Sequence, residues 1–301
     1  ARAFPYSQPS RRFAGWGTNL SRVGTEVAHR LTSAGGVCGI VAPSSLLADS
    51  TTARLREWIL HQFTLVEVTY WPAEARLFEN VDVPCLSMIS VRHVDSRPTR
   101  LVRMDSGGTI DDSGEVRLER AWLSRRNYAI PVIYGARGVA LLRELDTFPA
   151  FSELEGNGRS ALWAGRELDE TRRAAFTLRH GKRSFVRSVH IARLRRPVLP
   201  VREFIDEAKR RVPASADRVR IVWRDIARPS QKRRMHATVL PAGPVTGNSV
   251  GVAHFRDDDR TRLLALLGLI SSMPFEFQVR ALSMTNHVSL SVMRACRLPR
   301  L

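Results

Sequence analysis

The chain has 301 residues, of which 44% are hydrophobic, and it carries a formal net charge of +18. This length fits one large domain or two ordinary ones, with two slightly favoured, and the apolar fraction argues against wholesale disorder. The most apolar run, residues 263–270, is far too short to span a bilayer, and we expect no signal peptide.

The first predicted element is a helix over residues 20–31, whose apolar residues recur at a spacing of 3.6. They are Leu20, Val23, Val27, Ala28 and Leu31. The segment that follows ends this helix, and Gly35 or Gly36 suits the left-handed position after it. The continuous apolar run 37–43 is typical of a strand buried on both faces of a parallel sheet.

A second helix is predicted over residues 52–63, with Asp49 or Ser50 as its cap. Two strands follow, at residues 65–72 and 83–94. The alternation of helix, buried strand, helix and strand pair predicts half of a doubly wound α/β domain over residues 1–96.

A domain boundary is predicted near residue 97, where the sequence becomes rich in turns and polar residues. Residues 97–301 are typical of a mixed α/β domain with long loops. Two helices are predicted there, over residues 201–212 and 258–272. Asp257, Asp258 and Asp259 open the second one, where acidic groups complement the helix dipole.

The cysteines and histidines give no sign of a metal centre. Cys38, Cys85 and Cys296 are widely separated in apolar contexts, which favours buried reduced thiols in a cytoplasmic protein over disulfides. The eight histidines show no CxxC or HxxxH spacing, so no zinc site is expected.

The positive charge is concentrated beyond the predicted boundary. Residues 1–96 hold 9 Arg against 8 acidic residues, whereas residues 97–301 hold 38 Lys and Arg against 21 acidic residues. A genome that favours Arg codons explains a basic composition but not this asymmetry. The asymmetry indicates a polyanion-binding face, with nucleic acid favoured over lipid because no basic amphipathic helix stands out.

Residues 15–60 resemble the second half of the catalytic domain of N6-adenine DNA methyltransferases. The resemblance is to the Type II and Type IIG restriction–modification class, in its Alw26I/Eco31I/Esp3I-like and Eco57I-like families. In these enzymes a helix ending in Gly-Gly leads into a buried strand that closes on Pro-Ser, and a helix with a Leu-Arg pair follows. The corresponding residues here are Gly35–Gly36, Val37–Val41, Pro43–Ser44 and Leu55–Arg56.

The resemblance continues through the rest of the chain. Residues 66–91 are similar to the family's hairpin beside the substrate pocket, in which Phe78 precedes the last strand. Three later blocks, residues 161–168, 220–241 and 266–301, are similar to the target recognition domain of the same enzymes. The implied architecture is α/β: a partial Rossmann-like methyltransferase sheet over residues 1–96, followed by a mixed α/β target recognition domain over residues 97–301.

Two motifs of the family are missing from this chain. These enzymes bind S-adenosylmethionine through a Gly-rich loop and hold a flipped adenine with an Asn/Asp-Pro-Pro-aromatic tetrad. The stretch AFPY at residues 3–6 has one Pro and no amide or acid, so no residue is nominated as catalytic. Both motifs are expected upstream of residue 1 in a longer protein, and the chain alone is predicted to be inactive and to bind no cofactor. Without the first strands, the sheet is expected to expose an unpaired edge and an apolar face unless another chain covers them.

A basic loop between two strand-like runs is the main candidate for DNA binding. Residues 221–223 and 237–240 are predicted to be rigid supports, and Arg228, Lys232, Arg233 and Arg234 are predicted to lie against DNA. Between Arg193 and Arg234 there are 14 Lys and Arg against 5 acidic residues. Most such contacts position a protein on phosphates, while one or two specify bases. A solvated Arg-rich loop is the alternative.

Three further pairs of residues are candidates for DNA contacts, and each pair also has a structural explanation. Arg166 and Arg224 each follow an apolar run, and either DNA contacts or salt-bridge anchors fit this position. Asn286 and His287 interrupt an apolar region, as a DNA-contacting loop or as a turn. Arg137 and Arg159 lie in glycine loops that fit bare turns better than phosphate sites.

Two tryptophans and one loop complete the set of candidates. Trp163 and Trp223 can stack on bases, but strand tryptophans are more often core, and Trp223 is predicted to be buried. Open α/β sheets bind ligands at loops such as residues 42–50. The resemblance puts its members Pro43, Ser44 and Ser45 beside the adenine pocket of the intact enzyme.

The functional prediction is therefore the DNA-binding part of a site-specific adenine-N6 methyltransferase. The predicted partners are double-stranded DNA and either the missing N-terminal catalytic half or a partner subunit. No association with a membrane is predicted. The alternative is a non-enzymatic specificity subunit or adaptor that acts with a separate catalytic chain. An RNA-binding role ranks third, because the aromatic-rich sheet motifs of the usual RNA modules are not found.

Overall fold

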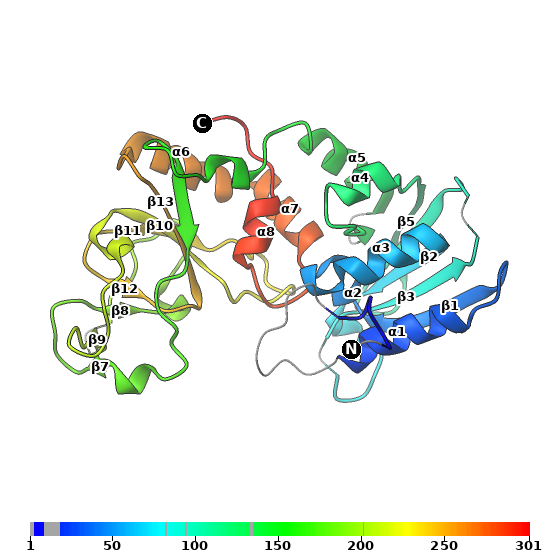
Figure 1. Ribbon diagram of the computed structural model, residues 1–301, viewed down its shortest axis with the longest axis horizontal. Coiled ribbons are helices and arrows are strands. Elements are labelled where there is room, and N and C mark those ends of the chain that lie inside the picture. Colours follow the sequence, from blue (N-terminus) through cyan, green and yellow to red (C-terminus); the bar gives the residue numbers. More distant parts are fainter. Residues whose placement is uncertain (1–2, 9–18, 82, 94, 133–134, 201) are drawn as a thin grey trace. The chain divides into compact units, whose positions relative to one another are not determined.

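The computed structural model describes residues 3–8, 19–81, 83–93, 95–132, 135–200 and 202–301. The chain forms two compact units (Figure 1). Unit 1 comprises Ala1–Leu145 and Arg280–Thr285, and unit 2 comprises Asp146–Val279 and Asn286–Leu301. The predicted boundary at residue 97 is therefore wrong, because two strands beyond it belong to the first sheet.

Unit 1 is built on a five-stranded sheet in the order β1-β3-β2-β4-β5. Its strands are β1 (Val37–Pro43), β2 (Thr64–Trp71), β3 (Cys85–Val91), β4 (Thr99–Met104) and β5 (Ile110–Val116). Its helices are α1 (Leu20–Leu31), α2 (Ser45–Ala48), α3 (Ala53–Gln62), α4 (Arg120–Ser124) and α5 (Gly135–Leu145). The α/β class is confirmed, together with both predicted helices and all three predicted strands of this segment.

The strand directions differ from those of the predicted sheet. β3 lies antiparallel between β1 and β2, while β2 and β4 are parallel. β4 and β5 form an antiparallel hairpin, with Asp105 accepting amide hydrogen bonds in the turn that joins them. Mixed sheets of this kind follow when an α/β unit ends in a hairpin.

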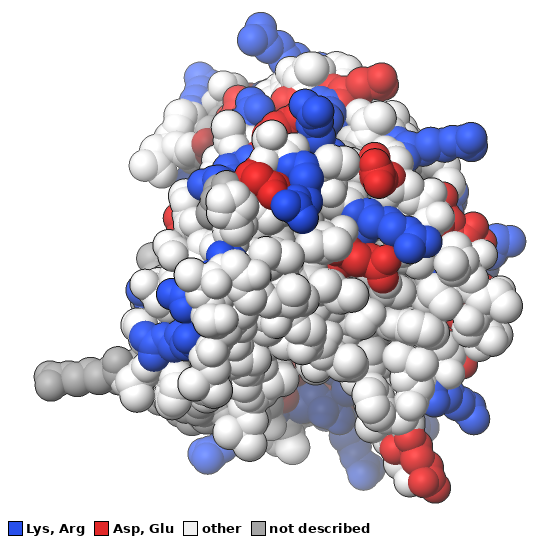
Figure 2. All heavy atoms as spheres, turned by 90° about the vertical axis from the view of Figure 1, so that its right-hand side faces the viewer, with Lys and Arg blue, Asp and Glu red and all other residues white. Residues whose placement is uncertain are grey.

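β1 is an edge strand in the described part of the sheet, and one of its faces is open. Val37 and Val41 are 66% and 61% exposed, and Ile89 of the neighbouring β3 is also exposed. Full burial of this run on both faces was predicted, and that prediction is wrong. The expected unpaired edge and apolar face are present, and Figure 2, which faces this end of unit 1, shows a broad uncharged area.

Helix α1 buries its polar face rather than its apolar stripe. Leu20 and Leu31 are largely exposed, whereas Glu26 and His29 are fully buried. The Glu26 carboxylate accepts hydrogen bonds from the amide and hydroxyl of Ser7, and His29 Nε2 lies 3.2 Å from the hydroxyl of Ser90 in β3. Hydrogen bonds to Ser7 and to Ser90 of the sheet therefore orient this helix, and periodicity alone picked the wrong face. Gly35 takes the predicted left-handed conformation after it, with φ of 73°.

Arg56 on α3 ties the helical layer of unit 1 together. Its guanidinium is buried and donates to the carbonyl oxygens of Leu46, Tyr128 and Asn127 at 3.0, 2.9 and 2.7 Å. Burial lowers the pKa of Arg56 to about 9, which still leaves the group charged at neutral pH. Asp49 or Ser50 was predicted to cap this helix, but the N-cap of α3 is Thr52, and Asp49 instead caps the short 3₁₀ turn at residues 50–52 that precedes it.

Unit 2 contains a four-stranded antiparallel sheet in the order β11-β10-β13-β6. These strands are β6 (Leu162–Gly165), β10 (Arg220–Arg224), β11 (Ala237–Leu240) and β13 (Val250–Phe255). Two small pairs accompany it: β7 (Thr177–Leu178) with β9 (Phe204–Ile205), and β8 (Phe185–Val186) with β12 (Val245–Thr246). The helices are α6 (Arg260–Ile270), α7 (Met273–Leu282) and α8 (Leu290–Ala295), and the last three residues of α7 fall in unit 1.

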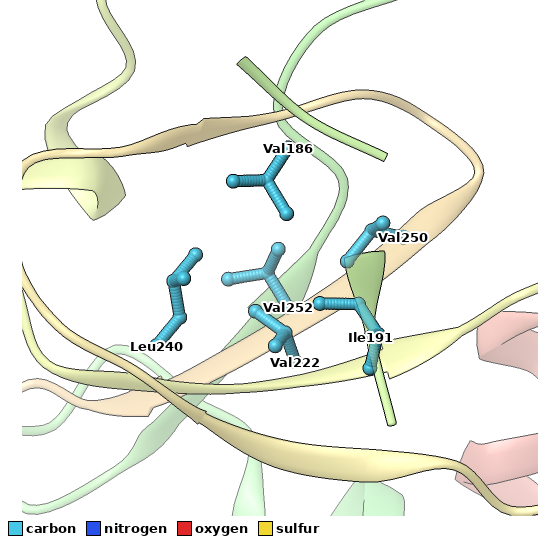
Figure 3. Packing of buried hydrophobic residues seen from close by; sticks show 6 residues of the cluster. All are labelled: Val186, Ile191, Val222, Leu240, Val250 and Val252. Atoms are coloured by element: carbon cyan, nitrogen blue, oxygen red, sulfur yellow. The ribbon is translucent and has the colours of Figure 1, made fainter. Parts of the chain in front are cut away.

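The sheet of unit 2 has a buried core on each face. On one face, six fully buried aliphatic side chains pack together (Figure 3). They are Val186, Ile191, Val222, Leu240, Val250 and Val252. Trp163 packs against this cluster. Trp223, on the opposite face of β10, is buried as predicted, and its indole N–H donates to the carbonyl of Val288 at 3.3 Å. The two predicted supports, β10 and β11, are thus confirmed as anchored strands.

The helix predicted over residues 201–212 is absent from the described residues 202–212. Phe204 and Ile205 make β9 instead, because Ile205 enters a second core with Phe176 and Phe185. The other predicted helix is α6, where Asp259 caps the first turn by accepting from the amide of Arg262 at 3.0 Å.

Within the described residues, no single helix has the length and apolar character needed to cross a membrane. Helices α6 and α7 taken together reach that length and apolar character, but the chain bends by 62° at the break between them.

Candidate nucleic-acid interface

One end of the four-stranded sheet gathers residues that are far apart in the sequence. β6 and β10 both run antiparallel to β13, so they are parallel to each other and finish at the same end of the sheet. Arg166 follows β6 and Asp225 follows β10 at this end, and β11 begins there. We call this region the sheet end and define it by Arg166, Asp225, Arg228, Lys232, Arg233, Asn286 and His287.

The loop between β10 and β11 contributes three cations to the sheet end. Arg228 and Lys232 are exposed and Arg233 is partly exposed. None of the three forms an ion pair within the described part of the chain. Their charges are therefore available to an external anion.

Arg234 does not belong to this surface, which corrects the prediction that all four basic residues of the loop face outward. Its side chain is buried, and its Nε donates to the carbonyl of Ala227 at 3.2 Å. Its backbone amide donates to the carboxylate of Glu276 on α7 at 2.9 Å. Arg234 thus fixes the base of the loop rather than its tip.

Arg224 is also held inside the fold. It is half-buried, and its Nε donates to the carbonyl of Ile191 at 2.6 Å. Of the two roles predicted for it, the structure supports that of an anchor, although the acceptor is a backbone carbonyl and not a carboxylate.

The Asn286–His287 loop is joined to the end of β10 by backbone hydrogen bonds. The amide of Ala227 donates to the carbonyl of Asn286 at 2.8 Å, and the amide of Val288 donates to the carbonyl of Asp225 at 2.6 Å. Both Asn286 and His287 are exposed. The loop therefore presents its polar side chains beside those of Arg166 and Arg228.

Asp225 is the buried centre of the sheet end. Its Oδ1 accepts from Arg166 Nη2 at 2.8 Å, and its Oδ2 contacts His287 Nδ1 at 3.0 Å. Burial by itself raises the pKa of Asp225, but the hydrogen bonds from His287 and Arg166 hold the pKa below its ordinary value. The hydrogen bond between His287 and Asp225 also raises the pKa of His287, whereas burial acts to lower it. The sequence gave no signal for Asp225 beyond an acid inside a basic segment.

The other candidates lie elsewhere. Arg137 is exposed on α5 in unit 1, and Arg159 is exposed before β6, at the opposite end of that strand. Trp163 is half-buried and stacks on His254, with ring centroids 5.2 Å apart. Arg159 and Trp163 therefore do not join the sheet end, and Arg137 belongs to unit 1.

The predicted adenine-pocket loop belongs to unit 1. Pro43 ends β1, Ser44 is buried with its amide donating to the carbonyl of Pro84 at 2.9 Å, and Ser45 begins α2. Cys38, Cys85 and Cys296 are buried free thiols. Within the described residues, no cluster of three His, Cys, Asp or Glu could hold a metal ion.

The charge asymmetry follows the two units. Unit 2 holds 28 Lys and Arg against 15 acidic residues, so it carries +13 of the total of +18. Part of this charge is neutralised internally, for example between Arg183 and Asp217 at 2.8 Å and between Arg294 and Glu155 at 2.6 Å. The unpaired cations of the sheet end are part of the remainder.

Solved structures of restriction–modification enzymes resemble this chain. One is the type IIL enzyme MmeI in complex with DNA, with a TM-score of 0.52 and 10% identity, covering 91% of this chain and 40% of that chain. Others are the type IIG endonuclease BpuSI, with a TM-score of 0.36 and 10% identity over 95% and 43%, and the DrdV–DNA complex, with a TM-score of 0.42 and 9% identity over 83% and 32%. No protein-family model and no curated protein matches the sequence.

The similarity to MmeI shows a shared fold. This chain spans less than half the length of these three enzymes, at 40%, 43% and 32% of their chains.

Proposed function

We propose that this chain is the DNA-recognition part of a restriction–modification methyltransferase. Unit 2 binds duplex DNA through the sheet end, and unit 1 is the second half of the catalytic sheet. The observation that carries the proposal is a set of cationic side chains at one end of the sheet. The β10–β11 loop contributes Arg228, Lys232 and Arg233, which form no ion pair among the described residues, and two other segments contribute Arg166 and His287, which are held by Asp225.

The physical reason is the chemistry of duplex DNA. Arg and Lys that neutralise phosphates release condensed counterions, which gives binding that weakens steeply with salt. The loop cations Arg228, Lys232 and Arg233 provide this term, because no carboxylate of the described chain competes for them. Arg166, Asn286 and His287 add donors that suit base edges.

The reaction of the whole enzyme is methyl transfer from S-adenosylmethionine to the N6 amino group of a flipped adenine. The chemistry of the cofactor and of the base requires residues that this sequence lacks, so the present chain supplies recognition alone. The open edge of β1 then suits the remaining strands of the catalytic sheet, which the rest of a longer protein or a partner chain supplies.

Binding of the chain to duplex DNA at two salt concentrations tests the proposal. Replacing Arg228, Lys232 and Arg233 together by Ala should weaken binding strongly and lower the slope of log K against log salt by about 3, or about one per phosphate contact. The matched control replaces Arg172, Arg179 and Lys182, which are exposed cations flanking β7, away from the sheet end (Figure 1). Equal losses in both variants would refute the sheet end as the interface.

A methyl-transfer assay with labelled S-adenosylmethionine tests the other half of the proposal. The isolated chain should incorporate no methyl groups into duplex DNA, and robust incorporation would contradict the division of labour. Whether an Asn-Pro-Pro-aromatic tetrad is encoded in frame upstream distinguishes a single-chain enzyme from a specificity subunit with a separate catalytic chain.

A further inference from the structure

The hydrogen bonds of Asp225 set this residue apart from the other buried acids of unit 2. Glu167, for example, pairs with Arg220, and both side chains are fully buried. Asp225 is 6% exposed as a side chain, yet its partners Arg166 and His287 are 42% and 56% exposed. The buried carboxylate therefore holds two side chains whose outer parts face solvent.

Stability alone does not account for this arrangement. Burying a carboxylate is costly, and an ion pair with an exposed Arg returns little stability. Fixing an exposed Arg side chain also costs rotamer entropy. The arrangement favours binding of a ligand that needs those donors in a fixed orientation. The entropy cost of ordering the two side chains then falls on folding and not on binding.

The geometry distinguishes base reading from phosphate contact. Each oxygen of Asp225 takes one partner, so Arg166 is held through Nη2 and His287 through Nδ1. Among the described residues, Asp225 is the hydrogen-bond acceptor that Arg166 meets, and the Arg166 side chain is 42% exposed. A phosphate accepts a cation from many directions, whereas a base edge requires donors fixed in its plane.

The chemical identity of the donors selects the base. Guanidinium N–H groups match the paired acceptors O6 and N7 on the major-groove edge of guanine. His287, when protonated, donates through Nδ1 to the Asp225 carboxylate and carries a second N–H group at Nε2. Adenine presents a donor at the position of O6 and fits this set poorly.

From this placement, and resting on the proposed function, we infer that Asp225 is a positioning residue. It orients Arg166 and His287 to read one guanine in the major groove of the recognised site. The cations Arg228, Lys232 and Arg233 then hold the DNA backbone, and the two sets of residues perform separable tasks.

Selection from a pool of duplexes with a randomised central segment tests the inference on the full chain. Wild-type protein should enrich a site that contains a required guanine. Asp225→Asn, which preserves shape and removes the charge, should relax selection at that single position and weaken binding to the selected site about 5- to 150-fold. The salt slope should stay unchanged, because Asp225 touches no phosphate.

Two further variants keep the test decisive. Arg166→Lys retains a charge at an exposed position but loses the paired donors, so it should relax the same guanine position even if Asp225→Asn folds poorly. Lys232→Ala is the matched control, which should lower the salt slope and leave the selected sequence unchanged. The double variant Asp225→Asn/Arg166→Lys should lose little more specificity than either single one.

The outcomes separate the inference from the function on which it rests. If wild-type protein binds no duplex at either salt concentration, the proposed function is wrong. If it binds and selects a site, but Asp225→Asn and Arg166→Lys leave the base preferences intact, the inference alone is overturned.

Discussion

The carboxylate of Glu167 and the guanidinium of Arg220 form a fully buried ion pair in unit 2, with Oε1 and Nε 3.0 Å apart. Glu167 also accepts from the amide and hydroxyl of Thr246 and from the hydroxyl of Ser215. Arg220 donates in addition to the carbonyls of Arg218 and Pro241. The ion pair and these hydrogen bonds together connect β10 to the segments that precede and follow it in the sequence.

Breaking this pair should destabilise unit 2 more than any surface change. Arg220→Met leaves Glu167 charged and buried without its partner, and should lower the free energy of unfolding by about 3–5 kcal/mol. The double variant Glu167→Leu/Arg220→Met should lose less unfolding free energy than the two single variants together, by at least about 1 kcal/mol. The reason is that Glu167→Leu removes the buried charge that Arg220→Met leaves without a partner. Denaturant unfolding of the four proteins in this cycle provides the measurement, and strict additivity would show that the two groups do not interact.

Arg56 should be a stability determinant of unit 1 with no part in DNA binding. Arg56→Met leaves several buried carbonyl oxygens without donors, so we expect a loss of about 3 kcal/mol in unfolding free energy. Arg54→Met, at an exposed position of the same helix, is the control and should change stability by less than about 0.5 kcal/mol. Comparable stability of the two variants would contradict the role assigned to Arg56.

Two basic residues two positions apart should behave in opposite ways. Arg234→Met should lower the thermal unfolding temperature, because the side chain is buried against the carbonyl of Ala227. Lys232→Ala should leave stability unchanged and reduce the salt slope of DNA binding by about 1. Melting curves and binding isotherms on both variants separate the effects, and a stable Arg234→Met protein with weakened DNA binding would reverse the assignment.

DNA affinity should rise as the pH falls through the pKa of His287. The pKa is raised above 6.5 by the hydrogen bond to Asp225, while Arg166 and Arg234 oppose the extra charge and burial opposes it further. The protonated imidazole adds a donor and a positive charge at the sheet end. Its contribution to stability is fully present below about 6.5 and is lost as the pH rises through the raised pKa.

Binding measured across this pH range checks the sign. Asp225→Asn removes the hydrogen bond that raises the pKa, so the step in affinity should move to lower pH. His287→Gln should abolish the step, and a step that survives in His287→Gln would assign the titration to another group.

The open edge of β1 should make the isolated chain self-associate. Val41→Lys places a charge on this edge and should reduce association with little change in stability, since Val41 is 61% exposed. Leu264→Lys makes the same kind of change at an exposed position of α6 and serves as the control. Sedimentation velocity over a range of concentrations should show more monomer for Val41→Lys only. Equal behaviour of both variants would show that the edge is not the contact.

Local sequence patterns predicted helices and strands more reliably than they predicted which side chains of those elements are buried. The capped run at residues 260–270 and the strands at 220–224 and 237–240 formed as expected, because their apolar residues and caps act over a few positions. The segment at 201–212 has the spacing of a helix but became β9, since Ile205 gains more by entering the core with Phe176 and Phe185. For α1, hydrogen bonds of Glu26 and His29 outweighed the apolar stripe.

The basic residues show the same division. Composition located the excess charge in the later part of the chain, yet it could not separate Arg234, which is buried, from Lys232, which is exposed. The two differ through a backbone turn that brings residue 234 to Glu276 on α7, a contact between residues 42 positions apart.

The sequence by itself determined the α/β class, the helices α1, α3 and α6, the strands β1, β2, β3, β10 and β11, and the basic character of the second unit, because short-range propensity and net charge are additive properties of residues. Only the tertiary structure decided that β4 and β5 join the first sheet, that α1 turns its polar face inward, and that Arg166, Asp225 and His287 meet at one sheet end. Those outcomes depend on pairings between distant segments, whose energies are set by the register and burial of the whole fold.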